Sequence, residues 1–112
     1  LYPNILLGKD KKIIFVTSKP ASIAENTGGA MYMNRTSRTA LNQAIKSMSI
    51  DLKDDGITVA SLSPGWVKTA SGGEGALITA QTSASGMRTV IANLQPEQTA
   101  LFADFKGEII PW

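Results

Sequence analysis

The sequence predicts an α/β fold with a parallel sheet of about three strands and two main helices. Three observations support this: short runs of consecutive apolar residues, longer segments with helical periodicity between them, and turn-forming residues at the junctions. Strands that alternate with helices are typical of βαβ units, whose strands pair in parallel. All 112 residues are expected to form a single domain.

The first expected strand covers residues 12–17. In the segment KKIIFVT two lysines precede four consecutive apolar residues, the pattern of a short strand that is buried on both faces. The next segment, SKPASIAENTGG, contains Pro20, Asn26, Gly28 and Gly29. Clustered turn formers of this kind predict a loop.

A long amphipathic helix is expected from about residue 32 to residue 54. Its apolar residues recur at steps of three and four, as Ala40, Leu41, Ala44, Ile45, Met48 and Leu52. The DDG sequence that follows ends the helix, with Gly56 as the expected residue just past its C-terminus.

The second half of the chain contains two more strands and a weaker helix. ITVASLS predicts a strand over 57–62, and PGWVKT the loop that leaves it. A helix is expected from about Thr82 to Leu94, with Thr82 or Ser83 available as its N-terminal cap. ALFADF predicts the third strand, over 100–105.

The order of these elements predicts how they are layered. Crossovers between neighbouring parallel strands are almost always right-handed, so strands in chain order would place both helices on one face of the sheet. The other face would then expose an apolar patch that soluble monomers rarely tolerate, and the first strand would have an unpaired edge. We therefore expect a missing part of the polypeptide or a second copy, hence a homo-oligomer, to complete the unit.

Composition excludes several classes of function. The net charge is only +2 and the basic residues are dispersed, which argues against nucleic-acid binding, and no apolar run approaches the roughly 18 residues of a membrane span. The absence of cysteine fits a reducing compartment such as the cytoplasm, and the absence of histidine removes the commonest metal ligand, so no metal site is expected. Leu1 in place of methionine, without a signal-peptide pattern, suggests a fragment or a chain that follows a removed tag.

Four segments in order resemble the C-terminal half of a short-chain dehydrogenase/reductase. They are IIFVTS, NTGGAMYMNRTSRTALN, DLKDDGITVASLSPGWVKT and GEIIPW, which together span nearly the whole chain. The sequence is most similar to the small carbonyl-reductase-like members of that family. The resemblance implies that the α/β fold is a partial Rossmann-like unit derived from a three-layer arrangement. It also implies NAD(P) as cofactor, a small carbonyl substrate, and a dimer or tetramer in which the long helix contributes to the interface.

The resemblance also implies a site. In the family, a tyrosine passes a proton to or from the substrate oxygen, and a lysine four residues later lowers the tyrosine pKa and holds the cofactor ribose. Residue by residue, Asn34 lies at the position of that tyrosine and Arg38 at that of the lysine, while Ser18 matches the active-site serine. The cofactor-binding positions fall on Arg38, which stands in place of the lysine, and on Pro64, Gly65 and Thr69, which match.

The departures from the family pattern bear on chemistry. The Asn34 carboxamide can form hydrogen bonds but cannot exchange a proton near neutral pH, and the planar fork of Arg38 differs from the point charge of a lysine. Tyr32 cannot substitute, because a shift of two residues turns a helical side chain by about 200°; we expect it to pack at the helix N-terminus. The family's glycine-rich turn, which seats the cofactor pyrophosphate, is absent.

Two functions remain open from the sequence. The first is a degenerate or truncated relative of the family that is not catalytically self-sufficient and acts through assembly. The alternative is one part of an NAD(P)-dependent carbonyl reductase whose cofactor half comes from upstream sequence or another chain. Ser18 is either a ligand-binding hydroxyl or a serine that bonds its local backbone, and Trp66 and Trp112 are expected to pack in a core or an interface.

Overall fold

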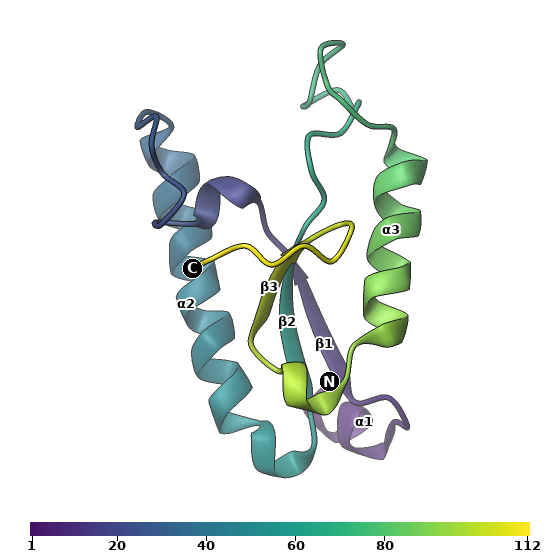
Figure 1. The fold of residues 1–112 in the computed structure, drawn as a ribbon. Helices are drawn as coiled ribbons and strands as arrows, with labels where there is room; N and C mark the ends of the chain where they lie inside the picture. The colour runs from purple at the N-terminus through teal and green to yellow at the C-terminus, as the bar shows by residue number, and fades with distance from the viewer.

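The computed structural model describes residues 1–112 and shows three parallel strands flanked by helices (Figure 1). The strands are β1 (Lys12–Val16), β2 (Thr58–Ser63) and β3 (Leu101–Asp104), and they lie in the sheet in the order β1-β2-β3. Both neighbouring pairs are parallel. The predicted fold class and all three predicted strands are therefore confirmed, with strand ends shifted by no more than one residue.

The helices and 3-10 turns are α1 (Tyr2–Leu7), η1 (Lys19–Ala21), α2 (Tyr32–Asp51), η2 (Lys53–Asp55), α3 (Ala80–Asn93) and η3 (Pro96–Gln98). The short α1 was not anticipated from the sequence. Helix α3 begins two residues earlier than predicted because Thr79, rather than Thr82 or Ser83, is its cap. The Thr79 hydroxyl oxygen accepts a hydrogen bond from the Thr82 backbone N–H at 3.1 Å.

Helix α2 forms because its apolar stripe packs on the sheet. Ile45 on this stripe is completely buried against Ile57 and Val59. Half-buried side chains surround this cluster, namely Ile5, Leu6, Ile13, Phe15, Leu41, Met48 and Leu52. Helix α2 ends at Asp51, earlier than predicted, so Gly56 does not lie just past its C-terminus. Gly56 has φ +70°, a left-handed conformation that favours glycine, and it ends the following η2 instead.

The two long helices lie on opposite faces of the sheet, and the prediction that both would share one face is wrong (Figure 1). Ser61 of β2 points toward α2, since its hydroxyl donates to Asn42 Oδ1 at 2.9 Å. Lys12 of β1 points the other way, toward α3, where its ammonium donates to the Ile91 carbonyl at 2.8 Å. Neither face of the sheet is bare.

This arrangement requires two crossovers of opposite hand, because the strands are parallel and follow chain order. One crossover therefore departs from the right-handed rule on which the prediction rested. The long connection of residues 64–79 before α3 gives the chain room to reach the second face. Local sequence patterns carry no information on which face a helix will take after such a connection.

The chain is nevertheless more exposed than a compact domain of its mass. Its accessible surface is 7260 Å², whereas a monomer of this mass exposes about 6,000 Å². Its radius of gyration is 14.5 Å, against about 13 Å for a compact domain of this length. Strand β1 pairs only with β2, so its other edge is unpaired, and Val16 at its end is 52% exposed.

None of the helices is both long and apolar enough to cross a bilayer.

The C-terminal segment folds back over the end of β3. Ile109 forms an antiparallel bridge with Ala103, and the Trp112 ring lies on Phe102 with 5.2 Å between ring centroids. The Ser22 hydroxyl donates to the Pro111 carbonyl at 2.5 Å. The last two residues therefore hold the loop that follows η1, and the Trp112 ring contacts the buried Phe102 while 38% of Trp112 stays exposed.

Candidate functional site

Ser18 lies two residues beyond the end of β1, at the edge of the sheet where the carboxyl ends of the strands meet. Its hydroxyl oxygen is buried and has no hydrogen-bond partner. The alternative that Ser18 bonds its local backbone is therefore wrong. A buried hydroxyl without a partner is uncommon, and an exception of this kind requires a physical explanation.

The residues on either side of Ser18 are both held by β2. The Thr17 backbone N–H donates to the Leu62 carbonyl at 2.8 Å, and the Thr17 hydroxyl lies 2.7 Å from the Ser61 hydroxyl. The Lys19 backbone N–H donates to the Ser63 hydroxyl at 3.1 Å. The backbone at Ser18 is thus fixed from both sides while its own side chain remains free.

Asn34 and Arg38 lie one turn apart on α2. Successive steps of four, three and four residues lead from Asn34 through Arg38 to the buried Ile45, so both continue the sheet-facing stripe beyond the strand ends. Asn34 is exposed and Arg38 is half-buried. Neither side chain has a hydrogen bond or an ion pair, which leaves an amide and a guanidinium available to a ligand.

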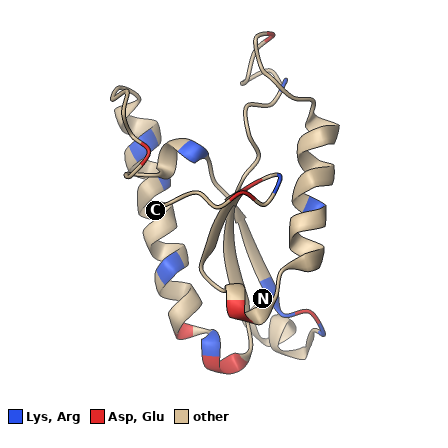
Figure 2. Ribbon diagram, in the orientation of Figure 1, with Lys and Arg blue, Asp and Glu red and all other residues tan.

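The first turns of α2 are tied to the segment after Ser18. The Thr39 hydroxyl donates to the Ala21 carbonyl at 2.9 Å, and Arg35 Nη1 donates to the Pro20 carbonyl at 3.4 Å. Met31, which precedes the helix, has φ +54° and offers no side-chain cap. The first turn of α2 contains no acidic residue, and basic residues lie near this end of the helix (Figure 2). The partial positive charge of the helix N-terminus is therefore not neutralised by its own residues.

The loop after β2 contributes Pro64 and Gly65. The Ser83 hydroxyl of α3 donates to the Pro64 carbonyl at 2.6 Å. Gly65 has φ +79°, and a Cβ atom there would lie 3.0 Å from both Ile78 and Phe105. Glycine is therefore required at this position by conformation and by space.

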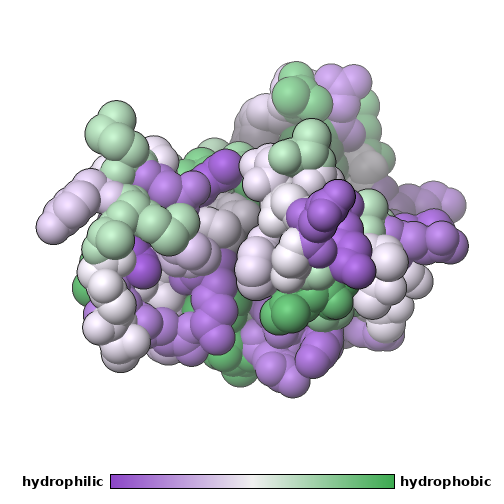
Figure 3. Space-filling view, turned by 90° about the horizontal axis from the view of Figure 1, so that it is seen from above, coloured by the Kyte–Doolittle hydropathy of each residue, from purple (hydrophilic) through white to green (hydrophobic).

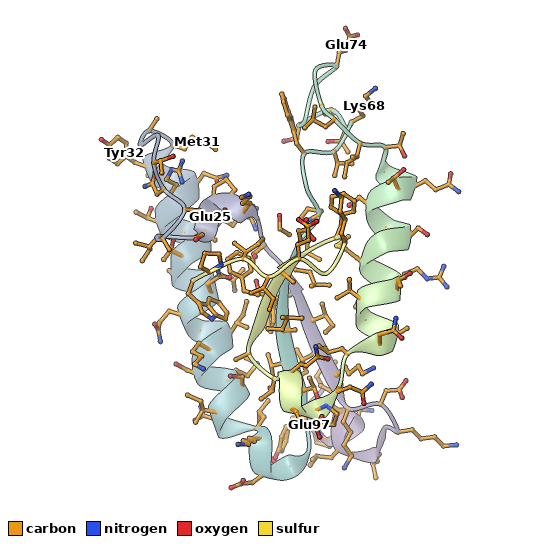
Figure 4. All side chains as sticks on the ribbon, viewed as in Figure 1. Glu25, Met31, Tyr32, Lys68, Glu74 and Glu97 are labelled. Carbon is orange, nitrogen blue, oxygen red and sulfur yellow. The ribbon has the colours of Figure 1, made fainter.

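The structure brings some predicted site residues together and separates another. Ser63 joins the loops after β1 and β2, since its hydroxyl accepts from both the Lys19 and the Gly65 N–H groups. Ser18 and Gly65 therefore lie near one another. Thr69 is exposed farther along its loop, next to Lys68, and contacts only its own turn (Figure 4).

Tyr32 and Trp66 do not pack as expected from the sequence. The Tyr32 side chain is 81% exposed at the tip of α2, where Figure 4 shows it next to Met31, so its expected packing role is wrong. Trp66 is also exposed, and its indole N–H donates to the Gly72 carbonyl at 2.8 Å. Seen from this end, hydrophilic and hydrophobic residues are mixed over the surface and form no single apolar patch (Figure 3).

Three buried polar side chains next to Ser18 form a hydrogen-bonded network that the sequence did not predict. Thr17, Ser61 and Asn42 are all almost completely buried and are linked by hydrogen bonds of 2.7 and 2.9 Å. The Asn42 side-chain nitrogen is buried without a partner. The only sequence signal was Ser61, a polar residue within the predicted strand over 57–62.

These features define the class of the protein as a Rossmann-like α/β unit with a polar site at the carboxyl ends of its strands, where open parallel sheets bind ligands. No model of a protein family matches the chain. Individual relatives do match. The sequence is 41% identical over 112 residues to the C-signal protein of Myxococcus xanthus, covering all of this chain and 68% of that protein. It is 36% identical to 1-hydroxy-2-glutathionyl-2-methyl-3-butene dehydrogenase of a Rhodococcus strain, covering 96% of this chain and 49% of that enzyme.

Solved structures that resemble the chain come from the same kind of protein as these sequence relatives. The carbonyl reductase Sniffer of D. melanogaster superposes with a TM-score of 0.87 at 42% identity, covering 90% of this chain and 41% of that one. An NADPH-bound carbonyl reductase from chicken fatty liver superposes with a TM-score of 0.83 at 31% identity, covering 90% and 42%. The chain therefore belongs to the short-chain dehydrogenase/reductase family, as its sequence predicted. It spans about half the length of most of these relatives.

Proposed function

We propose that the chain is a degenerate or truncated member of the family that is not catalytically self-sufficient and acts through assembly with other polypeptides. The observation that carries this proposal is Asn34 at the helix position where the resemblance expects the proton-donating tyrosine. A carboxamide has no proton to give or take near neutral pH, and the guanidinium of Arg38 does not lose one either. The two α2 positions that carry acid–base chemistry in the family therefore offer no group for it in this chain.

The residues present fit only part of a nicotinamide cofactor. A bound NAD(P)H would supply the hydride, and Arg38 and Ser18 could hold its ribose and the substrate oxygen, since both side chains are without partners. No glycine-rich turn is available for the pyrophosphate. Gly28 and Gly29 lie in the long loop between η1 and α2, and open space surrounds the Cβ position of each. Tight binding of the whole cofactor by this chain alone is not expected.

The exposed surface of the chain supports assembly. The excess of exposed area over a compact monomer is larger than the roughly 800 Å² that each partner buries in a standard interface. The unpaired edge of β1 and the exposed Ile50 on α2 are the surfaces available. The partner that we propose is a second copy of the chain or a separate cofactor-binding half. We also propose, from the absence of cysteine, that the chain is located in the cytoplasm.

The activity part of the proposal is tested with the full chain, NADPH and a panel of small ketones and aldehydes. We expect no oxidation of NADPH above the buffer rate and no rise in Tm with cofactor. Carbonyl-dependent NADPH oxidation by the isolated chain, lost in Ser18→Ala, would overturn it. The double variant Asn34→Tyr/Arg38→Lys, joined to a complete N-terminal half from a relative, is expected to gain activity if the site is merely degenerate.

The assembly part is tested by sedimentation equilibrium. We expect a mass greater than that of one 11.9 kDa chain. A monomeric mass, together with no binding of a dye that reports exposed apolar surface, would contradict assembly of identical copies.

A second candidate is one part of an NAD(P)-dependent carbonyl reductase whose cofactor half is supplied by missing upstream sequence or by another chain. The unpaired Ser18 hydroxyl and Arg38 guanidinium favour it, because both remain available to ligands. The hydride would add to the carbonyl carbon, and the proton that completes the alcohol would come from water or from a group on the other half. Activity of the unaltered chain mixed with such a half, and of neither part alone, would favour this candidate over the first.

A further inference from the structure

We propose that Asn42 is a positioning residue which, through Ser61 and Thr17, holds the end of β1 so that the Ser18 hydroxyl stays free for a ligand. The inference rests on the ligand-binding role proposed for Ser18. It concerns the geometry of the site before any ligand binds, and so it can be tested separately from activity.

The chemistry of the three side chains fixes the direction of their hydrogen bonds. Asn42 Oδ1 can only accept, so the Ser61 hydroxyl, 2.9 Å away, must donate its single proton to it. Ser61 then has no proton left for Thr17. The Thr17 hydroxyl must therefore be the donor in the 2.7 Å contact with Ser61. The amide oxygen of Asn42 thus determines the orientation of a hydroxyl next to Ser18.

Hydrogen bonds to β2 therefore fix the backbone on both sides of Ser18. On one side, Thr17 donates both its backbone N–H and its hydroxyl to β2; on the other, the Lys19 N–H donates to Ser63. Thr17 and Ser63 are both almost completely buried, so water does not compete for these bonds. The Ser18 hydroxyl lies between them, buried and unpaired. This arrangement presents one fixed hydroxyl whose hydrogen-bonding capacity is unused.

Packing alone gives no reason for an amide at position 42. The side chain is only 2% exposed and its nitrogen lacks a partner, which costs stability that an apolar residue of similar volume would not. What the amide provides and a leucine could not is the acceptor for Ser61. The helix α2 is anchored apart from Asn42 by Ile45 and Ser49, which are also buried.

The test uses the absence of cysteine from the chain, which makes Ser18→Cys a unique thiol probe. A buried thiol reacts with a thiol reagent only when the end of β1 opens, so the reaction rate measures that opening. Asn42→Leu should raise the rate in the Ser18→Cys background by about twofold to tenfold, the range that one lost hydrogen bond represents. Ser61→Ala, which removes the bond to Thr17 itself, should raise it at least as much, and adding Asn42→Leu to Ser61→Ala should raise it no further.

The matched control is Ser49→Ala. It removes a buried hydroxyl on the same helix, which donates to the Lys46 carbonyl at 2.7 Å, without touching β1. We expect it to lower the stability of the chain but to leave the thiol rate unchanged under native conditions. The proposal is overturned if neither Asn42→Leu nor Ser61→Ala changes the rate, or if Ser49→Ala changes it as much. Should Asn42→Leu fail to fold, Ser61→Ala alone decides, and no outcome depends on ligand binding or activity.

Discussion

The two long helices cover the same sheet but are attached to it in different ways. Helix α2 buries Asn42, Ile45 and Ser49 and packs on a continuous apolar cluster. Helix α3 buries only Ser83 and is held by separate contacts near its start, its middle and its end. The side of the molecule that bears Asn34 and Arg38 is therefore a packed layer, whereas α3 on the other side is held by a few separate contacts.

Three separate contacts hold α3 against the rest of the molecule. Ser83 donates to the Pro64 carbonyl, Gly86 lies against Phe105, and Lys12 donates to the Ile91 carbonyl. If the contrast is correct, changes in the α2 layer should cost the most, and each α3 contact should cost less.

The largest effect is expected from Ile45→Ala. Ile45 is fully buried between α2 and the sheet, so its truncation should lower the free energy of unfolding by about 3 kcal/mol through lost burial and a cavity. Urea denaturation followed by circular dichroism measures the change. The control is Ile50→Ala on the same helix, which is 63% exposed and should change stability by less than about 0.5 kcal/mol. Equal effects at the two positions would remove the contrast.

Gly86→Ala should come next. A Cβ atom at this position would lie 2.3 Å from the Phe105 carbonyl oxygen, so α3 would have to move away from the end of β3. We expect a loss of about 1–3 kcal/mol from this overlap, although alanine favours a helix over glycine by about 1 kcal/mol. Thermal unfolding of Gly86→Ala and of its exposed neighbour Ser85→Ala measures the difference. A stabilised Gly86→Ala variant would mean that α3 does not approach β3 so closely.

Lys12→Met should have a smaller effect. It removes the hydrogen bond to the Ile91 carbonyl near the end of α3 but keeps most of the apolar stem, so the expected loss is about 1 kcal/mol. Hydrogen exchange should rise in the last turn of α3 and remain unchanged in α2. Lys46→Met, an exposed position on α2, is the matched control. Loss of protection in both helices would indicate that they respond as one unit.

The smallest effect concerns α1, which is tied to η2 by a hydrogen bond of 2.6 Å from the Tyr2 hydroxyl to Asp55. This bond raises the pKa of Tyr2 above its usual value of 10.0, with smaller contributions from burial and from the negative charge of Asp55. Because the folded-state pKa is the higher one, the contribution to stability is complete below pH 10 and is lost as the pH rises through the folded pKa. Phenolate absorbance in a Tyr32→Phe background should titrate later than in Tyr32→Phe/Asp55→Asn. Identical curves would show that the contact does not persist in solution.

The sequence was a good guide to elements and a poor guide to how distant segments meet. The apolar run before Thr17 and the stripe through Ile45 located β1 and α2 because both signals are local periodicities. The face taken by α3 was missed, because it depends on the path of residues 64–79 and on a crossover hand that departs from the rule.

In the candidate site, too, the features set by local sequence were predictable and those set by contacts between distant segments were not. Ser18 could be recognised because it follows a strand directly, within a motif that resembles the family. The hydrogen-bonded network of Thr17, Ser61 and Asn42 could not be recognised. Thr17 and Ser61 are 44 residues apart in sequence, Ser61 and Asn42 are 19 apart, and the three meet only in the folded protein. Tyr32 was misplaced because an aromatic residue at a helix start says nothing about whether another element covers it.

The parallel sheet described above also has a consequence for how the chain folds. Every ladder joins strands that are separated in sequence by a whole helix and its loops, and β2 can be completed only after both flanking segments have returned to it. Non-local pairing of this kind folds slowly, because loop closure must precede any gain from strand contacts. Until then the apolar residues of β1 remain exposed along an open edge, so the rate of folding, more than final stability, is expected to limit how much of the chain escapes aggregation during synthesis.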